Sequence, residues 1–290
     1  MIIDGKEIAK QIRQELRDKV SALLSEGKRA PRLGIVIVGH NPASETYVAN
    51  KMKACAEVGI EAVRIAYEDT ISEAQLLQEV ENLNADNSID GFIVQLPLPA
   101  HISEQHITSA IDYRKDVDGL TPENVGRTAQ GLPSIVSATP RGIRELLARY
   151  DIPTDGKHIV VIGRSNIVGK PMASLLMQKH EHGNATVTLC HSHTVHLKEI
   201  CLSADIIIVA VGHPGLLTAD MVSQGATVID VGITRVEDAT SPKGYRICGD
   251  VDFENVAPKC AYITPVPGGV GPMTIVSLLQ NTLAAYEHIR

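Results

Sequence analysis

The sequence predicts an α/β protein built on parallel sheets, and three observations carry this prediction. Apolar runs such as 33–38 and 159–162 are short, continuous and rich in Val and Ile, as strands buried on both faces of a parallel sheet are. Between such runs lie segments whose apolar residues recur at helical spacing. The two patterns alternate along the chain, which is typical of strand–helix–strand crossover units.

The first half of the chain carries clear helix start signals. Asn41 and Pro42 have the order of an N-cap and a first-turn proline. Ser72 and Gln75 have the spacing of a capping box, in which each side chain binds the backbone N–H of the other residue. The helices expected here are 7–24, 42–58 and 72–83, and the strands are 33–38, 63–66 and 92–96.

The second half repeats the alternation after a break at Asp151-Ile152-Pro153. Before the break, Thr139-Pro140 predicts the start of a helix over 141–150. We predict a first domain over 1–140 and a second over 141–270, with a closing helix in 271–290 that packs back on the first. The strands expected in the second domain are 158–162, 185–189, 205–211 and 226–231.

Composition excludes several classes of function. The net charge of −7 and the pI near 5.9 argue against a nucleic-acid surface, and the absence of Trp argues against a base-stacking platform. No apolar run approaches the length of a membrane span, and the start of the chain has no signal-peptide pattern. Five cysteines without CxxC spacing are typical of buried thiols in a reducing compartment. We therefore expect a cytoplasmic protein without nucleic-acid or membrane partners.

Gly163 and Gly169 enclose the turn around which the second domain is organised. A strand, a glycine turn and a helix N-terminus together form an anion site, because backbone N–H groups and the helix dipole face one point. The usual GxGxxG spelling is absent, since Arg-Ser-Asn-Ile-Val separates the two glycines. On the motif alone, an ordinary strand–helix loop is an equally good interpretation.

The residues after the next strand indicate which dinucleotide would bind. NAD-binding folds usually place an acidic residue there, on the ribose hydroxyls. This chain has His191-Ser192-His193 instead, and Arg164 lies in the glycine turn. Donors and positive charge suit a 2′-phosphate, so we predict NADP rather than NAD. The histidines lack HExxH or CxxC partners, so no metal site is expected.

Tyr47 and Lys51 lie one turn apart beside the core stripe of the helix 42–58. Val48, Met52 and Cys55 form that stripe. A partly desolvated lysine has its charged form disfavoured, so it can serve as an acid or base near neutral pH. A lysine with its stem on the surface and a solvent-exposed tyrosine explain the spacing equally simply, and on spacing alone they are the commoner case.

Two further segments have the composition of binding loops. The segment Asp112–Gly119 carries three aspartates, and the carboxylate of Asp118 could accept two parallel N–H bonds from an amidine-like edge. The alternatives are an Asp-Gly turn with a solvated Lys115–Asp116 pair, or a hard-metal site whose other ligands are not evident. The segment Ile263–Thr274 holds three prolines and three glycines, which suits close approach to a flat ligand or a linker.

Five blocks taken together resemble a known family over essentially the whole chain. They are 47–51 (YVANK), 94–99 (VQLPLP), 115–119 (KDVDG), 163–169 (GRSNIVG) and 265–273 (PVPGGVGPM). In this order they resemble the bifunctional 5,10-methylenetetrahydrofolate dehydrogenase/5,10-methenyltetrahydrofolate cyclohydrolase family of one-carbon metabolism, the FolD type. The resemblance implies two α/β domains with a cleft between them, the second Rossmann-like and NADP-binding, and a homodimer joined through the NADP domains.

The resemblance also implies roles for single residues. Lys51 would be the catalytic lysine of the cyclohydrolase step, with Tyr47 stacking on the folate substrate and Gln95 tuning the lysine. Asp118 would grip the edge of the pterin ring. The folate slot would be lined by Pro265, Val266, Pro267, Gly268 and Gly269, and NADP would be held by Gly163, Arg164, Ser165, Ser192 and Ile233. The implied activity is oxidation of methylenetetrahydrofolate and then hydrolysis of the methenyl product.

Two other functions remain open at this point. One is a different NADP-linked oxidoreductase of two-domain build, of the shikimate or quinate type. The other is a folate- or NADP-binding protein without catalysis. The spacing of Tyr47 and Lys51 together with the block 115–119 argues against the first, and a complete lysine network argues against the second, because binding alone does not require Lys51.

Overall fold

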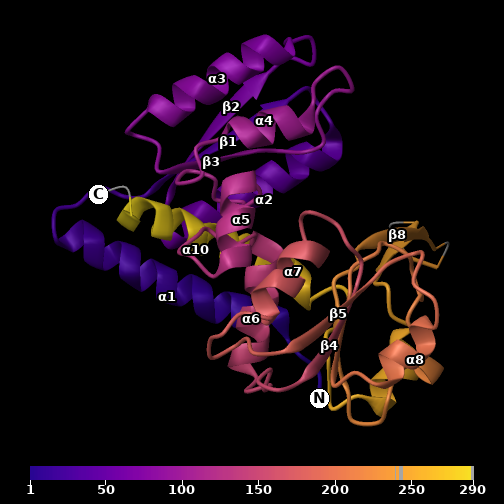
Figure 1. The fold of residues 1–290 in the computed structure, drawn as a ribbon. Helices are drawn as coiled ribbons and strands as arrows, with labels where there is room; N and C mark the ends of the chain where they lie inside the picture. Colours follow the sequence, from indigo (N-terminus) through magenta and orange to yellow (C-terminus); the bar gives the residue numbers. More distant parts are fainter. Residues whose placement is uncertain (239, 242–243, 289–290) are drawn as a thin grey trace. The chain divides into compact units, whose positions relative to one another are not determined.

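The computed structural model describes residues 1–238, 240–241 and 244–288, and its contacts divide the chain into two compact units. We call them the Lys51 unit (Lys10–Ala138 and the chain from Ile275 onward) and the Gly163 unit (Met1–Ala9 and Thr139–Thr274). Figure 1 shows strands covered by helices in each unit. The last two residues of the predicted closing segment 271–290 lie outside the described residues.

The first nine residues differ from the predicted domain division. We expected them in the first domain, whereas the contacts group them with the Gly163 unit. The physical reason is a backbone pairing, because Ile3 N donates to Ile263 O at 2.8 Å and Ile2 forms a parallel bridge with Ile263. Such a pairing joins residues far apart in sequence, so no local pattern announces it.

The Lys51 unit contains a three-stranded parallel sheet in the order β2-β1-β3. The central strand, β1, is buried from Leu33 to Val38, as its apolar run predicts. The elements are β1 (Arg32–Val38), α2 (Pro42–Val58), β2 (Glu61–Tyr67), α3 (Glu73–Ala85), β3 (Gly91–Val94), α4 (Glu104–Ala110) and α5 (Pro122–Gln130), with most of α1 (Gly5–Ser25) and α10 (Val270–His288).

Local signals account for the helix boundaries in this unit. Asn41 caps α2 by accepting from two backbone N–H groups, and Ser72 with Gln75 forms the predicted capping box of α3. Helix α5 was not predicted, although it carries the same signals. Its N-cap is Thr121 followed by proline, and Gly131 closes it in the left-handed conformation.

The Gly163 unit contains a five-stranded parallel sheet in the order β10-β7-β6-β4-β5. Its elements are α6 (Ala138–Arg149), β4 (His158–Ile162), α7 (Gly169–Leu176), β5 (Thr186–Cys190), α8 (Leu197–Leu202), β6 (Ile206–Val209), η1 (Ala219–Met221), β7 (Thr227–Asp230), β8 (Thr234–Glu237), β9 (Tyr245–Cys248), α9 (Phe253–Val256), η2 (Ala257–Lys259) and β10 (Tyr262–Ile263).

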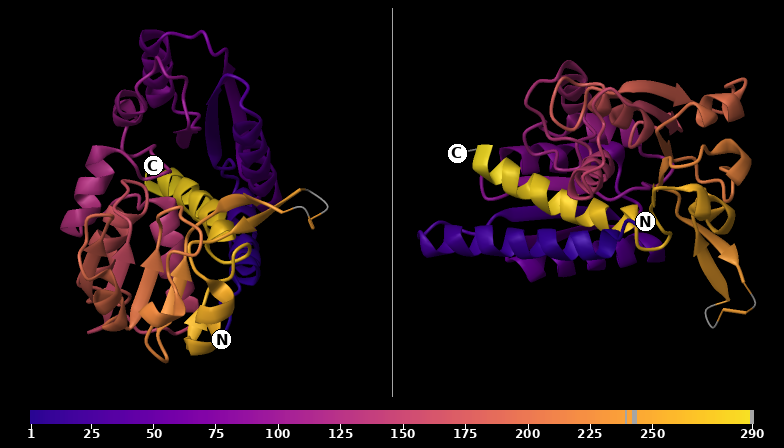
Figure 2. Two further views of the ribbon diagram at one scale, coloured as in Figure 1. Left: turned by 90° about the vertical axis from the view of Figure 1, so that its right-hand side faces the viewer. Right: turned by 90° about the horizontal axis from the view of Figure 1, so that it is seen from below.

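Two details of this unit correct the prediction. Helix α6 begins at Ala138, so Thr139 lies inside its first turn rather than at the N-cap, and its hydroxyl lies 3.1 Å from the Thr274 hydroxyl. The antiparallel pair β8–β9 was not predicted, and Figure 2 shows it projecting away from the five-stranded sheet.

The strand order places a ligand crevice at β4. The chain runs from β4 to its neighbour β5 and then returns to β6 on the other side of β4. Ligands of open parallel sheets bind outside the carboxyl ends of the strands at such a reversal. The loops meet there, because Gly163 N donates to Cys190 O at 2.9 Å and Ala210 N donates to Ile162 O at 2.8 Å.

Candidate active site

The turn after β4 has room for glycine alone at both of its ends. Gly163 has a φ of 119°, and a Cβ there would lie 2.2 Å from Ala210 O. A Cβ on Gly169 would lie 1.9 Å from Gly163 O. Real Cβ atoms do not approach an oxygen so closely, so the backbone is folded back on itself in a way that side chains would prevent. The turn thus offers a backbone cradle at the start of α7.

Ser165 changes the expected picture of free N–H groups at this helix. Its Oγ accepts from Val168 N at 3.2 Å and from Gly169 N at 3.4 Å. These two donors were predicted to face a ligand and are instead satisfied inside the loop, because the serine hydroxyl reaches back over the helix start. Arg164 is exposed, and among the described residues nothing binds its guanidinium. It is therefore the cation of this turn that remains available.

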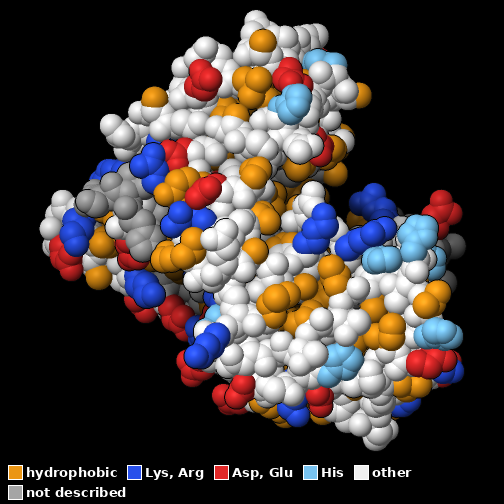
Figure 3. Space-filling model, viewed as in Figure 1, with side chains coloured by type: hydrophobic (Ala, Val, Ile, Leu, Met, Phe, Trp, Pro, Cys, Tyr) orange, Lys and Arg blue, Asp and Glu red, His pale blue; other side chains and the backbone are white. Residues whose placement is uncertain are grey.

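The loop after β5 presents the predicted histidines together. His193 N donates to His191 Nδ1 at 3.1 Å, and the two rings meet edge to face with centroids 6.1 Å apart. Ser192 and His193 are exposed. Figure 3 shows Lys, Arg and His side chains gathered above β5 and beside β8. This edge of the Gly163 unit is suited to a phosphate group.

Lys51 and Gln95 come together in the Lys51 unit. Lys51 Nζ donates to Gln95 Oε1 at 3.1 Å, and Gln95 Nε2 donates to Leu96 O at 2.7 Å, which fixes the amide orientation. Gln95 N also donates to Val36 O at 2.8 Å, so this residue continues the pairing of β3 with β1. The ammonium group is thus held at the carboxyl ends of two adjacent strands.

The surroundings of Lys51 agree with its predicted place beside the core. Val48 and Cys55 are buried and Met52 is half-buried. Burial raises the pKa of the Cys55 thiol to about 12, and the nearby Lys51 charge opposes part of that rise. Tyr47 lies one turn earlier with 55% of its surface exposed, and no hydrogen bond joins its hydroxyl to other described residues. A ring so exposed is available for stacking.

The three aspartates of the segment 112–119 have different environments. Arg114 binds Asp112, and this hydrogen bond lowers the pKa of the Asp112 carboxyl. Asp116 is buried and accepts from Gly119 N at 2.9 Å and Thr121 N at 2.7 Å. The half-buried Asp118 carboxylate has no hydrogen bond or ion pair with any described residue. Of the three, Asp118 is the one left to bind a ligand.

The alternative of a solvated Lys115–Asp116 pair is wrong. Lys115 is 5% exposed and donates to Leu83 O at 2.9 Å and Asp86 O at 2.7 Å. These carbonyls lie at the end of α3, so the lysine satisfies acceptors that the helix leaves open. Burial lowers the pKa of Lys115 and raises that of Asp116. Both residues hold the loop in shape rather than face solvent.

Two asparagines that the sequence analysis missed hold the turn that carries Asp118. Asn124, on α5, donates to Tyr113 O at 2.7 Å and to Asp116 Oδ2 at 3.0 Å. Asn281, on α10, donates to Val117 O at 2.8 Å and Val136 O at 2.9 Å. An asparagine inside an apolar helix stripe was the available signal for Asn281, since a buried amide requires partners.

Replacing Asn281 with Ala is expected to lower the free energy of unfolding by about 2 kcal/mol, because it removes the side-chain donor from the buried carbonyl of Val117 and the half-buried carbonyl of Val136. Thermal unfolding followed by circular dichroism measures this as a loss of roughly 5 °C. The matched control is Asn82→Ala on α3, whose side chain is exposed. Equal melting temperatures for the two variants would contradict the assigned role of Asn281.

The segment 265–269 forms a tight loop in the Gly163 unit. Gly269 N donates to Pro265 O at 2.8 Å, and the Val266-Pro267 peptide bond is cis. The loop lines a cavity of about 150 Å³ that also includes Lys6 and Ile233. Ile233 is 57% exposed. The predicted folate loop and the predicted nucleotide contact therefore share one cavity.

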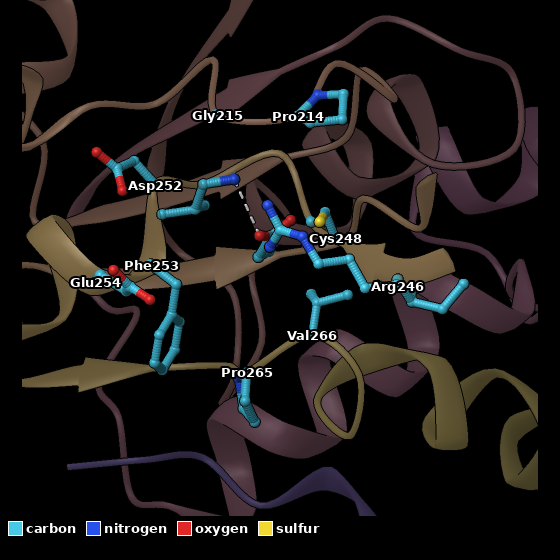
Figure 4. Close-up of a pocket in the computed structure, with 13 residues that line it drawn as sticks. Pro214, Gly215, Arg246, Cys248, Asp252, Phe253, Glu254, Pro265 and Val266 are labelled. Carbon is cyan, nitrogen blue, oxygen red and sulfur yellow. Dashed lines mark hydrogen bonds between the residues drawn. The ribbon is translucent and has the colours of Figure 1, made fainter. Parts of the chain in front are cut away.

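A larger cavity of about 600 Å³ lies in the same unit. Figure 4 shows Pro214 and Gly215 on one side of it and Pro265 and Val266 on the other. Asp230 lines both cavities. Within the described part of the chain there is no group of three or more His, Cys, Asp or Glu able to hold a metal ion, and no helix suited to spanning a membrane.

Comparison with known proteins adds two family matches. A model of the tetrahydrofolate dehydrogenase/cyclohydrolase NAD(P)-binding domain matches residues 137–290, and a model of the catalytic domain of the same family matches residues 3–118. The bifunctional protein FolD of Porphyromonas gingivalis is 61% identical over 284 residues, which cover 98% of this chain and 96% of that protein.

Solved structures agree with these matches. The bifunctional FolD enzyme from Campylobacter jejuni has a TM-score of 0.94 at 45% identity, covering 100% of this chain and 99% of that one. The methylenetetrahydrofolate dehydrogenase-cyclohydrolase of Trypanosoma brucei, complexed with NADP cofactor and inhibitor, has a TM-score of 0.92 at 39% identity, covering 100% and 98%.

Proposed function

The chain belongs to the tetrahydrofolate dehydrogenase/cyclohydrolase family, and from this premise we propose that it catalyses two consecutive reactions. It oxidises 5,10-methylenetetrahydrofolate to 5,10-methenyltetrahydrofolate with NADP, and then hydrolyses the methenyl group to give 10-formyltetrahydrofolate. The observation that carries the proposal is the Lys51–Gln95 hydrogen bond. It fixes the position of a side chain that can transfer protons during the hydrolysis of the methenyl group. The two family matches favour this function over a shikimate- or quinate-type dehydrogenase.

The glycine cradle supports NADP as the cofactor. Gly163 and Gly169 let the backbone fold tightly against Ala210 O and Gly163 O, which gives the compact turn at the start of α7 that a pyrophosphate site requires. Arg164, Ser192 and His193 add exposed donors on the loops after β4 and β5, suited to a 2′-phosphate. When bound, the cofactor accepts a hydride from the methylene carbon of the folate. Ile233 offers an apolar surface for the nicotinamide end.

Three features of the described residues support folate as the substrate. The segment 265–269 presents backbone and proline rings to a flat ligand. Asp118 accepts two N–H bonds from the amidine-like edge of the pterin, since its carboxylate has no partner among the described residues. Tyr47 stacks on the ligand through its exposed ring. These contacts orient the reacting carbon, and orientation is a large part of catalysis.

Lys51 is proposed to manage protons in the hydrolysis. The methenyl carbon is electrophilic, so water adds to it, and a proton must leave that water. Ring opening then requires a proton on the departing nitrogen. The neutral amine of Lys51, held by Gln95, can take the first proton, and the ammonium so formed can deliver the second, which makes Lys51 the base and then the acid of this step.

The proposed function is tested by assaying the purified protein with methylenetetrahydrofolate and each nicotinamide cofactor in turn. Reduced cofactor and the methenyl intermediate are followed at separate wavelengths. We expect cofactor reduction with NADP and a methenyl signal that decays as hydrolysis proceeds. Absence of cofactor reduction would refute the dehydrogenase, and stable methenyl product would refute the cyclohydrolase.

Arg164→Ala is expected to raise the KM for NADP about tenfold while changing the KM for NAD less than about twofold. The guanidinium would bind the 2′-phosphate, which NAD lacks. Loss of one charge-assisted hydrogen bond weakens binding by about this factor. Steady-state kinetics with both cofactors measure it. Lys179→Ala, which removes another exposed cation of the same unit, serves as the control. Equal losses for both cofactors would show that Arg164 does not read the phosphate.

We also propose a cytoplasmic homodimer joined through the Gly163 unit. The family resemblance supports this state, and among the described residues each strand of the two-stranded β8–β9 sheet has an unpaired edge that a second copy could cover. All five cysteines are free thiols, which agrees with a reducing compartment. Sedimentation analysis at micromolar concentration tests the dimer, and a mass near 31.2 kDa would contradict it.

A further inference from the structure

Two buried acidic residues of the Gly163 unit are not among the residues proposed to contact folate or NADP. Asp230, the last residue of β7, is 2% exposed, and Asp250, which follows β9, is completely buried. Buried carboxyl groups are costly unless hydrogen bonds satisfy them. Their partners therefore show what these residues hold in place.

Asp250 holds the loop that follows β6. Its Oδ2 accepts from Val211 N at 2.7 Å and from Gly212 N at 3.0 Å. Its Oδ1 is buried without a hydrogen-bond partner among the described residues. The loop it binds is otherwise exposed, with 39% of Val211 accessible. A single carboxylate oxygen thus anchors the backbone of an exposed loop at the crevice.

Asp230 holds the loop that follows β7 and connects it to Asp250. Its Oδ1 accepts from Gly232 N at 3.0 Å and from Asp250 N at 2.9 Å, and its Oδ2 accepts from Val251 N at 3.0 Å. Its own N–H donates to Thr264 Oγ1 at 2.7 Å, immediately before the segment 265–269. The two acids therefore connect three separate loops at the carboxyl edge of the sheet.

The backbone is pressed onto these carboxylates at two glycines. A Cβ on Gly232 would lie 2.4 Å from Asp250 Oδ1, and a Cβ on Gly249 would lie 1.9 Å from Asp230 Oδ2. Larger residues at either position would push the carboxylates away. Close approach at both places fixes the position of Ile233, which follows Gly232 directly.

Burial of the Asp230 carboxyl group disfavours its charged form, as its pKa indicates. Burial raises the pKa of Asp230 to about 6, backbone hydrogen bonds oppose the rise, and the neighbouring Asp250 adds to it. The other charged groups that line the cavities at Asp230 are Lys6, Arg246, Asp252 and Glu254. Acids whose pKa is shifted by burial in a crevice are enriched at functional sites.

We propose that Asp230 and Asp250 are positioning residues of the dehydrogenase step, which hold the loops after β6 and β7 against the nicotinamide end of the cofactor. The inference rests on the proposed function, because it assigns that end of the cofactor to Ile233. Neither acid touches the reacting atoms, so each acts through the loop backbone. Their removal misplaces the nicotinamide ring and leaves the adenosine end of the cofactor and the hydrolysis at Lys51 unaffected.

The test compares Asp250→Ala, which removes the acceptor of two loop N–H groups, with Asp250→Asn, which keeps an oxygen in the Oδ2 position. Asp155→Ala serves as the control, since it removes an exposed carboxylate of the same unit that holds neither loop. Three quantities are measured: the dehydrogenase kcat, the dissociation constant of 2′,5′-ADP as a probe of the adenosine end, and the rate of methenyl hydrolysis.

We expect Asp250→Ala to lower the dehydrogenase kcat about 30-fold, because a small misplacement of reacting groups has effects of this order. Binding of 2′,5′-ADP and methenyl hydrolysis should stay within about threefold of wild type in all variants, and Asp250→Asn should retain most of the kcat. If Asp250→Ala does not fold, Asp250→Ser replaces it, with an expected loss of about tenfold.

A wild-type kcat in the Ala or Ser variant contradicts the inference. A loss of 2′,5′-ADP affinity or of hydrolysis rate as large as the loss of dehydrogenase kcat also contradicts it, because such a loss reveals a general disturbance of the fold. The outcome is separable from that of the proposed function. A wild-type protein that reduces no NADP refutes both, whereas an active wild type with unaffected variants refutes only the positioning role.

Discussion

Replacing Lys51 with Met is expected to lower the rate of methenyl hydrolysis about 1,000-fold, the middle of the range for a positioned acid or base. Methionine keeps an unbranched apolar stem one helical turn before Cys55 and lacks the ammonium group that binds Gln95. Folding and NADP binding should therefore persist. The measurement is the decay of added methenyltetrahydrofolate, with NADP affinity determined in parallel on the same preparation.

The control for this experiment is Lys53→Met, on the same helix but exposed. It removes the same charge from α2 without touching Gln95, so its hydrolysis rate should equal that of wild type. Gln95→Ala should cause an intermediate loss, because the ammonium group remains but its orientation is released. A full hydrolysis rate in Lys51→Met would refute the assignment of the catalytic lysine.

Replacing Asp118 with Ala is expected to weaken folate binding about 100-fold. A ligand loses much of its affinity when the side chain that binds one of its polar groups is removed. The three aspartates of this loop differ in whether protein groups already bind their carboxylates. Arg114 binds Asp112, and the backbone of its own loop donates hydrogen bonds to Asp116. The carboxylate of Asp118 is not bound by any described residue. The affinity can be measured by titration with a folate analogue in the absence of NADP.

Asp112→Ala is the matched control for Asp118→Ala, since it removes a carboxylate of the same loop that already has a partner. Its folate affinity should remain within about threefold of wild type, and Asp118→Asn should lie between the two. Unchanged folate affinity in Asp118→Ala would exclude this residue from the substrate site.

The parts of the fold that the sequence predicts are those governed by local rules. The capping box at Ser72 and the cap at Asn41 depend on residues within one helical turn, and both are present. The continuous apolar run of β4 predicts its burial in a parallel sheet. The lysine and glutamine of the candidate site were joined by family resemblance, and the structure adds their hydrogen bond.

The parts that local rules missed depend on partners distant in sequence. Asp116 and Asp118 have the same residue type two positions apart, and the donors Gly119, Thr121 and Asn124 around Asp116 distinguish them. The charge of Lys115 suggested a solvent-exposed side chain. Its ammonium group is instead buried, because it donates to backbone carbonyls at the end of α3 that have no partner within the helix. The turn after β4 was predicted to present free backbone N–H groups, but the Ser165 hydroxyl accepts from two of them.

The hydrogen bonds from Asn281 have a consequence for the order in which the protein matures during synthesis. Val117 and Val136, whose carbonyls it binds, are made in the first half of translation, but their donor belongs to the final helix. A nascent chain that has not yet emerged beyond residue 281 therefore carries Asp118 on an incompletely supported turn. Ribosome-bound intermediates should acquire folate affinity only after residue 281 has emerged and the helix that carries it has packed.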